Sequence, residues 1–268
     1  MQIAVLGVGV MGATLLSALV RAGQDPAGVS VSDKMAARTA EVASEFGVTG
    51  TTPDRAVLGA DIVIIAVKPQ DMPGLLAQCH ANVSSDALVL SIAAGISTEY
   101  LEDRLPAGTS VVRVMPNTPA LVDQAMSALA SGQHCTAEHM AQAEDLLATV
   151  GKVVVLDEGH MDAVTAISGS GPAYIFYVVE AMIEAGVLLG LPRATATELS
   201  VQTLFGAATM LRQTGQHPTV LREQVSSPGG TSVAALRALE DHKVRAAFMS
   251  AMEAAAKRSA ELSSGSLS

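Results

Sequence analysis

The stretch Gly7-Val8-Gly9-Val10-Met11-Gly12 decides the fold that the sequence predicts. It follows a short apolar run, Ile3–Leu6, and precedes apolar residues that recur at helical spacing. A glycine-rich turn between a strand and a helix lets backbone N–H groups approach a pyrophosphate, and the helix N-terminus favours the negative charge. The stretch therefore predicts a dinucleotide site; a glycine-rich turn that binds nothing is the alternative.

Short apolar runs alternate with helical patterns as far as Asp157. The runs expected to form strands are Ile3–Leu6, Val29–Ser32, Ile62–Val67, Leu88–Ala93, Val111–Met115 and Val153–Leu156. Continuous apolar runs are typical of strands that are covered on both faces, and three runs fit this description: Ile62–Val67, Leu88–Ala93 and Val111–Met115. This alternation predicts an α/β fold with an N-terminal Rossmann-type, doubly wound parallel sheet.

Strand signals stop after Asp157, and helical stretches rich in alanine, leucine and methionine follow. These stretches are Ala173–Leu189, Arg193–Gly215 and a last one from Thr231 onward. We therefore place a domain boundary near residue 160, with one domain at 1–160 and an all-helical domain at 161–268. The tail from Ser263 is rich in serine and glycine and is expected to fray.

Composition and charge narrow the class of partner. The chain has 268 residues, 49% of them hydrophobic and 16% charged, which is typical of a folded protein. A net charge of −10 argues against nucleic acid and anionic membrane as partners. The apolar runs are shorter than the roughly 20 residues of a membrane span. The glycine motif starts at residue 7, which leaves no room for a signal peptide, and Cys79 and Cys135 form no CxxC pair. We therefore expect a cytoplasmic protein.

Asp33 follows the glycine motif by about 20 residues, at the end of the second expected strand, where an acidic residue holds the ribose hydroxyls of NAD. Its neighbours Ser32, Lys34 and Arg38 could instead meet the 2′-phosphate of NADP. An aspartate that caps the next helix is an equally good interpretation. The sequence leaves this choice open.

Further candidate ligand-binding residues follow later strands. Lys68 lies in Val67-Lys68-Pro69, Ala94 and Gly95 end the fourth strand, and Asn117 lies in a proline-flanked turn after the fifth. The carboxyl ends of parallel strands face the ligand crevice of such sheets. Asn117 could therefore bond a cofactor carboxamide or the substrate, and a plain turn residue is the alternative. A solvated surface lysine is the alternative for Lys68.

A second glycine-rich loop precedes the last helical run, at 226–232. Gly229 and Gly230 are followed by Thr231 and Ser232, so the loop predicts a helix N-terminus with free N–H groups. Such a terminus suits a carboxylate, and a hydroxyl of Thr231 or Ser232 could meet a ring nitrogen of a small acid. Ordinary helix capping by serine or threonine is the alternative. The six histidines have no metal-ligand spacing, so we expect no metal.

Several stretches, taken together, resemble the pyrroline-5-carboxylate reductase family. The motifs that carry the resemblance lie at 66–69, 91–95, 113–120, 168–174 and 225–240, in the family's order. The similarity extends from the N-terminus to about Leu262.

The resemblance implies a Rossmann domain at 1–160 and a helical domain at 161–268 that binds substrate and dimerises. It implies a homodimer, often assembled into a decamer. It also implies reduction of 1-pyrroline-5-carboxylate to L-proline, the last step of proline biosynthesis, with NADPH and often NADH.

The resemblance further implies roles for individual residues. Cofactor contacts are implied at Val10, Met11, Ser32, Lys34, Val67, Lys68, Ala94 and Glu158. Substrate contacts are implied at Gly230, Thr231 and Ser232, and the hydroxyl of Ser232 or Thr231 would orient the imine nitrogen. Val10 replaces an asparagine that is frequent in the family's glycine motif, and Pro53 replaces another on the adenosine side. Asp33 stands where many members have a residue that is more compatible with a 2′-phosphate. The preference between NADPH and NADH therefore stays open.

Two other functions are alternatives to the reduction of a cyclic imine. A 3-hydroxyacid dehydrogenase-like enzyme needs a lysine acid or base in its helical domain, but residues 161–241 contain no lysine. A nucleotide sensor would keep the glycine loop and lose the substrate loop, and this chain has both. Oligomer size, proline feedback and activity on related ring imines stay open.

Overall fold

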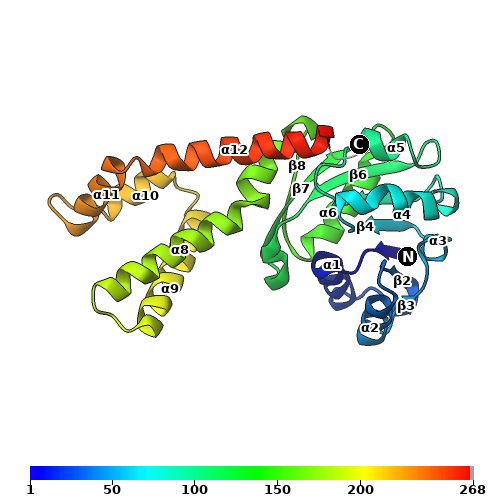
Figure 1. Ribbon diagram of the computed structural model, residues 1–268, viewed down its shortest axis with the longest axis horizontal. Coiled ribbons are helices and arrows are strands. Elements are labelled where there is room, and N and C mark those ends of the chain that lie inside the picture. The colour runs from blue at the N-terminus through cyan, green and yellow to red at the C-terminus, as the bar shows by residue number, and fades with distance from the viewer. Residues whose placement is uncertain (266–268) are drawn as a thin grey trace. The chain divides into compact units, whose positions relative to one another are not determined.

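The computed structural model describes residues 1–265. Its backbone divides into two compact units (Figure 1). The first unit contains Met1–Ser170 and the described residues from Ala255 on, and the second contains Gly171–Ala254. The domain boundary predicted near residue 160 stays a prediction.

An eight-stranded sheet forms the centre of the first unit, with the order β3-β2-β1-β4-β5-β6-β7-β8. The strands are β1 (Ile3–Leu6), β2 (Val29–Ser32), β3 (Thr49–Gly50), β4 (Ile62–Ile65), β5 (Leu88–Ser91), β6 (Ser110–Met115), β7 (Ala125–Ser131) and β8 (Gly151–Val155). Neighbouring strands are parallel except β6 and β7, which are antiparallel. The strand order reverses between β1 and β4, so a ligand crevice is expected beyond their carboxyl ends.

Helices cover both faces of this sheet. They are α1 (Val10–Arg21), α2 (Ala36–Phe46), α3 (Pro53–Ala56), α4 (Met72–Cys79), α5 (Thr98–Glu102), α6 (Ala137–Ala148) and α7 (Met161–Val164). Ile3 and Val5 of β1 pack in one apolar cluster with residues of α1, α2 and α6. Ala4 and Leu6 pack in a second cluster with residues of α3, α4 and α5. Burial on both faces explains why the strands read as continuous apolar runs.

The predicted doubly wound sheet is confirmed, with differences at particular strands. β1 and β2 have the predicted bounds, whereas β4 ends at Ile65, two residues before the predicted end. Two strands, β3 and β7, were not predicted from the sequence, and β3 is only two residues long. β7 reads AMSALAS, a composition that has no strand signal, and it is the strand that runs antiparallel.

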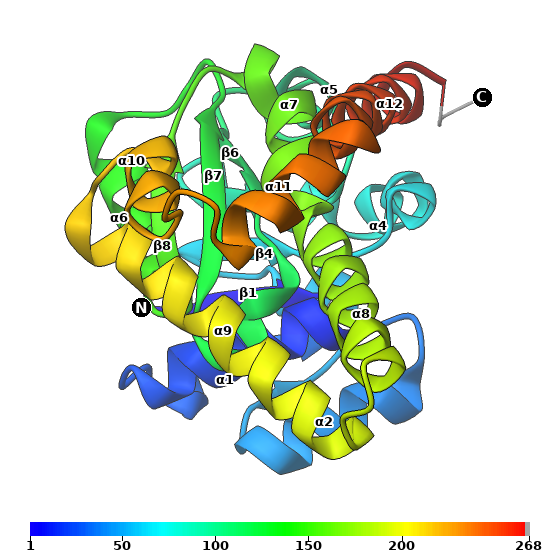
Figure 2. The same cartoon turned by 90° about the vertical axis from the view of Figure 1, so that its left-hand side faces the viewer.

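The second unit is entirely helical over its described residues. Its helices are α8 (Gly171–Leu188), α9 (Arg193–Thr214), α10 (Pro218–Gln224), α11 (Thr231–Asp241) and the first part of α12 (Val244–Gly265). α8 and α9 pair as a hairpin (Figure 1, Figure 2). The single helix predicted from Thr231 onward is wrong, because Lys243 has a φ of 57° and separates α11 from α12. α12 includes Ser263, where fraying was expected, and residues 266–268 lie outside the described range.

The second unit leaves much apolar surface exposed. Among its described residues, Ala196 and Ser200 are the buried ones, whereas Phe205 is 66% exposed and Leu188 is 87% exposed. The helical stretch Glu158–Leu188 has 31 residues and a window with a mean hydropathy of 1.3, so by length and composition alone it could cross a membrane. Polar residues interrupt the apolar runs of this stretch, so the expectation that no segment spans a membrane stays a prediction. Apolar surface on this scale marks a contact site.

Candidate functional site

The glycine loop has the geometry of a phosphate cradle. Gly7 has a φ of 93°, and a methyl group added there would lie 2.7 Å from the carbonyl oxygen of Ala66. A methyl group at Gly12 would clash with the carbonyl oxygen of Gly7, whereas one at Gly9 would meet no atom within 4 Å. Gly7 and Gly12 are thus required for packing, and Gly9 faces open space. Gly9 also precedes α1, whose N-terminus has no side-chain cap, so this loop fits a pyrophosphate.

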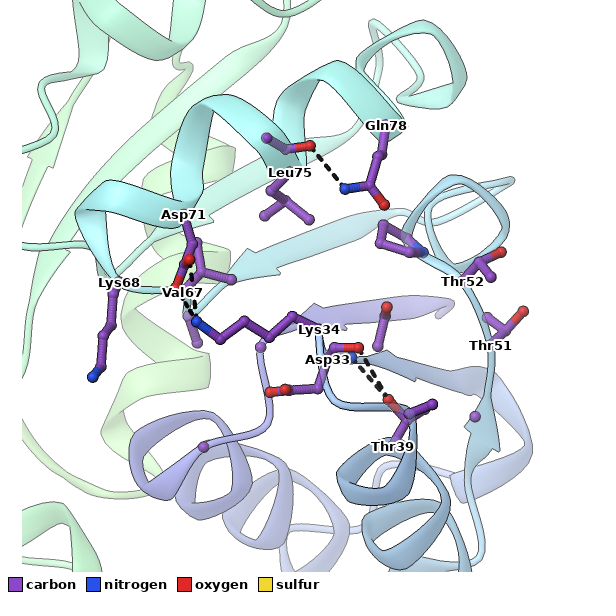
Figure 3. Close-up of a pocket in the computed structure, with 18 of the residues that line it drawn as sticks. Asp33, Lys34, Thr39, Thr51, Thr52, Val67, Lys68, Asp71, Leu75 and Gln78 are labelled. Carbon is purple, nitrogen blue, oxygen red and sulfur yellow. Dashed lines mark hydrogen bonds and ion pairs between the residues drawn. The ribbon is translucent and has the colours of Figure 1, made fainter. Parts of the chain in front are cut away.

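A cleft of about 1040 Å³ opens beside this loop (Figure 3). Segments that follow β1, β2 and β4 line it, together with part of α4. The predicted cofactor residues that line the cleft are Gly7, Gly9, Ser32, Asp33, Lys34, Val67 and Lys68. The cleft is large enough for half of a dinucleotide.

Asp33 holds the backbone around the cleft. Its Oδ2 accepts a hydrogen bond from the N–H of Val8 at 3.0 Å, and its Oδ1 accepts one from the N–H of Met35, just before α2, at 3.0 Å. Arg38 Nε donates to the carbonyl oxygen of Val8 at 2.9 Å. Asp33 and Arg38 therefore both fix the glycine loop. The alternative in which Asp33 caps α2 does not hold, because Met35 is at the N-cap position and no side chain caps that helix. Each carboxylate oxygen of Asp33 can still accept a second bond, so the ribose contact stays a prediction.

Two other predicted residues of this cleft differ in their environment. Ser32 Oγ is buried and has no hydrogen-bond partner within the described part of the chain. Lys34 Nζ is paired with Asp71, at 2.9 Å from Oδ2 and 3.2 Å from Oδ1. Asp71 was not among the residues predicted from the sequence. Asp71 follows β4 and Lys34 follows β2, so both lie at the carboxyl-end edge of the sheet, where ligands bind. This shared position could have identified Asp71 from the sequence.

Glu158 joins three elements of the first unit. Its Oε1 accepts hydrogen bonds from the N–H of Thr98 at 2.9 Å and from Arg113 at 3.2 Å, and its Oε2 accepts one from the Thr98 hydroxyl at 2.6 Å. The Arg113 side chain is only 8% exposed. Glu158 therefore holds the start of α5 and balances a buried guanidinium. Its implied role as a cofactor contact stays a prediction.

Asn117 also bonds within the protein. Its Oδ1 accepts from the N–H of Met126 at 2.9 Å, and its Nδ2 donates to the carbonyl oxygen of Ser168 at 3.1 Å. Ser168 belongs to a π-helix at Thr165–Gly169, a rare form that is frequent at functional sites. One N–H of Asn117 and one lone pair remain, so its ligand role stays a prediction.

The loop that follows β5 carries two more predicted residues. Ala94 is exposed, and Gly95 has a φ of 74°, a conformation that favours glycine. A methyl group added at Gly95 would lie 3.4 Å from the backbone nitrogen of Ser263 in α12. The end of α12 thus packs closely on this loop.

The glycine-rich loop at 226–232, which the sequence predicts to contact substrate, belongs to the second unit. α11 begins at Thr231 as predicted, after Gly229 with a φ of 70° and Gly230 at the N-cap position. No side chain caps this terminus, so the capping alternative does not hold for Thr231 or Ser232. The hydroxyls of Thr231, which is exposed, and of Ser232, which is half-buried, make no hydrogen bond among the described residues. Backbone N–H groups and two hydroxyls are thus available to a carboxylate.

The cysteines have the properties of packing residues. Burial raises the pKa of the Cys79 thiol to about 11, and burial also raises the pKa of Cys135. Since the thiolate is the reactive form, neither is suited to nucleophilic chemistry at neutral pH. Residues 1–265 contain no cluster of histidine, cysteine and carboxylate side chains that could hold a metal ion.

Known families and proteins resemble this chain over almost its whole length. A family model described as pyrroline-5-carboxylate reductase dimerisation matches residues 158–262, and one described as NADP oxidoreductase coenzyme F420-dependent matches residues 2–95. Pyrroline-5-carboxylate reductase of Corynebacterium melassecola is 47% identical, covering 97% of this chain and 98% of the relative. That of Methanosarcina acetivorans is 41% identical, covering 97% of each.

Solved structures agree with this relationship. A pyrroline-5-carboxylate reductase from Coxiella burnetii has a TM-score of 0.91 and 34% identity, covering 98% of each chain. Pyrroline carboxylate reductase of Plasmodium falciparum, solved with NADP bound, has a TM-score of 0.89 and 27% identity, also covering 98% of each.

The glycine cradle can be tested with Gly9→Ala. The added methyl group meets no protein atom within 4 Å, so the fold should be retained. It would occupy the space through which a pyrophosphate approaches, so we expect the dissociation constant for NADPH to rise about tenfold or more, by 1.4 kcal/mol or more. Isothermal titration calorimetry measures this change. Gly206→Ala adds the same group in open space on α9 and should leave binding unchanged. Unchanged binding by Gly9→Ala would contradict the assignment.

The role of Glu158 can be tested with Glu158→Gln. The substitution removes the charge that faces the buried Arg113, so we expect a loss on the order of 1–3 kcal/mol in the free energy of unfolding. Urea unfolding measures this loss. Glu240→Gln breaks an exposed pair with Arg245 and should cost less than about 1 kcal/mol. Full stability of Glu158→Gln combined with weaker NADPH binding would instead favour a cofactor contact.

Proposed function

Because the chain belongs to the pyrroline-5-carboxylate reductase family, we propose that the N-terminus of α11 holds the substrate carboxylate and that the glycine loop holds the cofactor pyrophosphate. The chain reduces 1-pyrroline-5-carboxylate to L-proline with NADPH in the last step of proline biosynthesis, and NADH is proposed as a second hydride donor. The uncapped start of α11 after Gly229 and Gly230 is the observation that carries the substrate assignment.

The start of α11 suits an anionic ring acid for electrostatic reasons. The unpaired N–H groups of the first turn carry partial positive charge, and the dipole of an 11-residue helix adds to it. Gly229 and Gly230 remove side chains that would cover these groups. A carboxylate bound there would lie beside the Thr231 and Ser232 hydroxyls, either of which can donate to or orient the imine nitrogen.

The residues of the chain chiefly bind and orient the reactants in this proposal. The reduced nicotinamide, when bound, supplies the hydride. Ala94, Gly95 and Asn117 form the proposed nicotinamide end, and the Ser232 or Thr231 hydroxyl fixes the imine. No strong acid is needed, because an iminium can form in solution before binding. Orientation alone can contribute roughly 7–11 kcal/mol to such a step.

The assembly proposed for the chain is a homodimer, with a decamer as the larger form. The dimerisation model covers residues 158–262, and the exposed apolar residues of α8 and α9 lie in this range. The apolar stretch Glu158–Leu188 falls almost entirely within it, so a subunit interface accounts for its composition without a membrane. A cytoplasmic location is proposed with it.

Ser232→Ala tests the hydroxyl role. A hydrogen bond to a charged group contributes about 1.5–3 kcal/mol, so kcat/KM for pyrroline-5-carboxylate should fall about tenfold to a hundredfold, with NADPH binding unchanged. Ser84→Ala is the matched control, because that exposed hydroxyl belongs to the first unit, accepts from the N–H of Asp86 at 3.2 Å and does not line the cleft. An efficiency within about twofold of wild type would remove Ser232 from the mechanism.

The mass in solution tests the assembly. We expect sedimentation equilibrium at micromolar concentration to give a dimer or a multiple of it. Phe205→Glu places a charge on the exposed apolar face of α9 and should shift the protein toward monomer. Leu58→Glu changes an equally exposed leucine of the first unit and should leave the mass unchanged. A wild-type monomer would refute the dimer.

A further inference from the structure

An ion pair lies across the cleft of the first unit. Lys34 follows β2, and Asp71 ends a short turn, Pro69–Asp71, that follows β4. Both carboxylate oxygens contact Lys34 Nζ, at 2.9 Å and 3.2 Å (Figure 3). The pair thus connects the carboxyl ends of the two strands that flank β1. Its side chains are 67% and 31% exposed, so the pair is accessible to a ligand in the cleft.

The other charged groups near the end of β2 are already engaged. Asp33 lines the cleft and accepts hydrogen bonds from two backbone N–H groups. Arg38 is bonded to the carbonyl oxygen of Val8 and paired with Glu41 at 2.9 Å. Lys34 differs from Arg38 because its ion-pair partner, Asp71, itself lines the cleft.

We propose that Asp71 is a specificity-determining residue for the cofactor, because it competes with the 2′-phosphate of NADPH for the Lys34 ammonium. The inference rests on the proposed function, which assigns this cleft to the adenosine end of the cofactor. A 2′-phosphate carries close to two negative charges, so it must share or displace the Asp71 carboxylate and meets the charge of Asp33 as well. The 2′-hydroxyl of NADH needs no cation and is not opposed by either carboxylate. Asp71 thus reduces the difference in binding affinity by which the protein prefers NADPH to NADH.

The pair is weak enough to be displaced. An exposed ion pair contributes at most about 1 kcal/mol, which corresponds to about fivefold in affinity. A pair of this strength would leave the cleft open to both cofactors, and Asp71 would set the ratio of their affinities. Since exposed charges are screened by ions, the effect should shrink as the salt concentration rises.

Asp71→Asn tests the competition by binding alone, with 2′-phospho-ADP-ribose and ADP-ribose as probes. The two probes differ only in the 2′-phosphate, and neither contains the nicotinamide. We expect Asp71→Asn to tighten binding of 2′-phospho-ADP-ribose by about threefold to fivefold at low salt and to leave ADP-ribose within about twofold. Calorimetric titration at low and high salt measures both affinities.

Two further variants make the outcome decisive. Lys34→Gln should weaken binding of 2′-phospho-ADP-ribose alone; no effect would show that Lys34 does not meet the phosphate and would overturn the proposal. Asp123→Asn removes an exposed carboxylate that pairs with Arg21 at 2.6 Å and does not line the cleft, so neither affinity should change.

The remaining outcomes each count against the idea. Unchanged affinities in Asp71→Asn would overturn it, and so would weaker binding of 2′-phospho-ADP-ribose, which would mean that Asp71 orients Lys34 toward the phosphate. A wild-type protein that binds neither probe would refute the assignment of the cleft itself. Wild-type binding of ADP-ribose with no effect of Asp71→Asn would refute only the role of Asp71.

Discussion

The close approach of the glycine loop to the end of β4 is the constraint on which the cofactor site depends. Gly7 donates its N–H to the carbonyl oxygen of Ser32 at 2.7 Å, while its α-carbon faces the Ala66 carbonyl at a distance that leaves no room for a side chain. One residue thus connects the ends of β2, β1 and β4. As a consequence, α1 begins with its free N–H groups at the crevice between these strands.

Several polar residues at this edge stabilise the loops around the site. Asp33 accepts a hydrogen bond from the N–H of Val8, and Arg38 donates one to the carbonyl oxygen of Val8. Glu158 holds the start of α5, and Asn117 connects β7 to the π-helix. Buried polar groups need partners, so residues with spare hydrogen-bonding capacity are suited both to fix a loop and to contact a ligand. The substrate loop is different, since the α11 terminus and its hydroxyls have no such partner among the described residues.

The sequence predicted the features that local chemistry determines. The β1 and β2 runs, the glycine turn and the start of α11 each carry their own signal within a few residues. β7 was missed because alanine and serine have little strand preference, and its position comes from pairing with β6 and β8. The bonds of Glu158 to Thr98 and of Lys34 to Asp71 join residues far apart in sequence, so spacing could not reveal them. The break at Lys243 was missed because lysine rarely adopts a positive φ.

Reduction of the cyclic imine 1-pyrroline-5-carboxylate is the reaction for which the cofactor and substrate sites are proposed. The most direct measurement is the decrease in absorbance of NADPH when the wild-type protein is mixed with 1-pyrroline-5-carboxylate. We expect oxidation that requires the imine and yields proline in equal amount, and slower oxidation when the carboxylate-free 1-pyrroline, whose product is pyrrolidine, is supplied instead. A folded protein that binds NADPH but oxidises none of it with pyrroline-5-carboxylate would contradict the account.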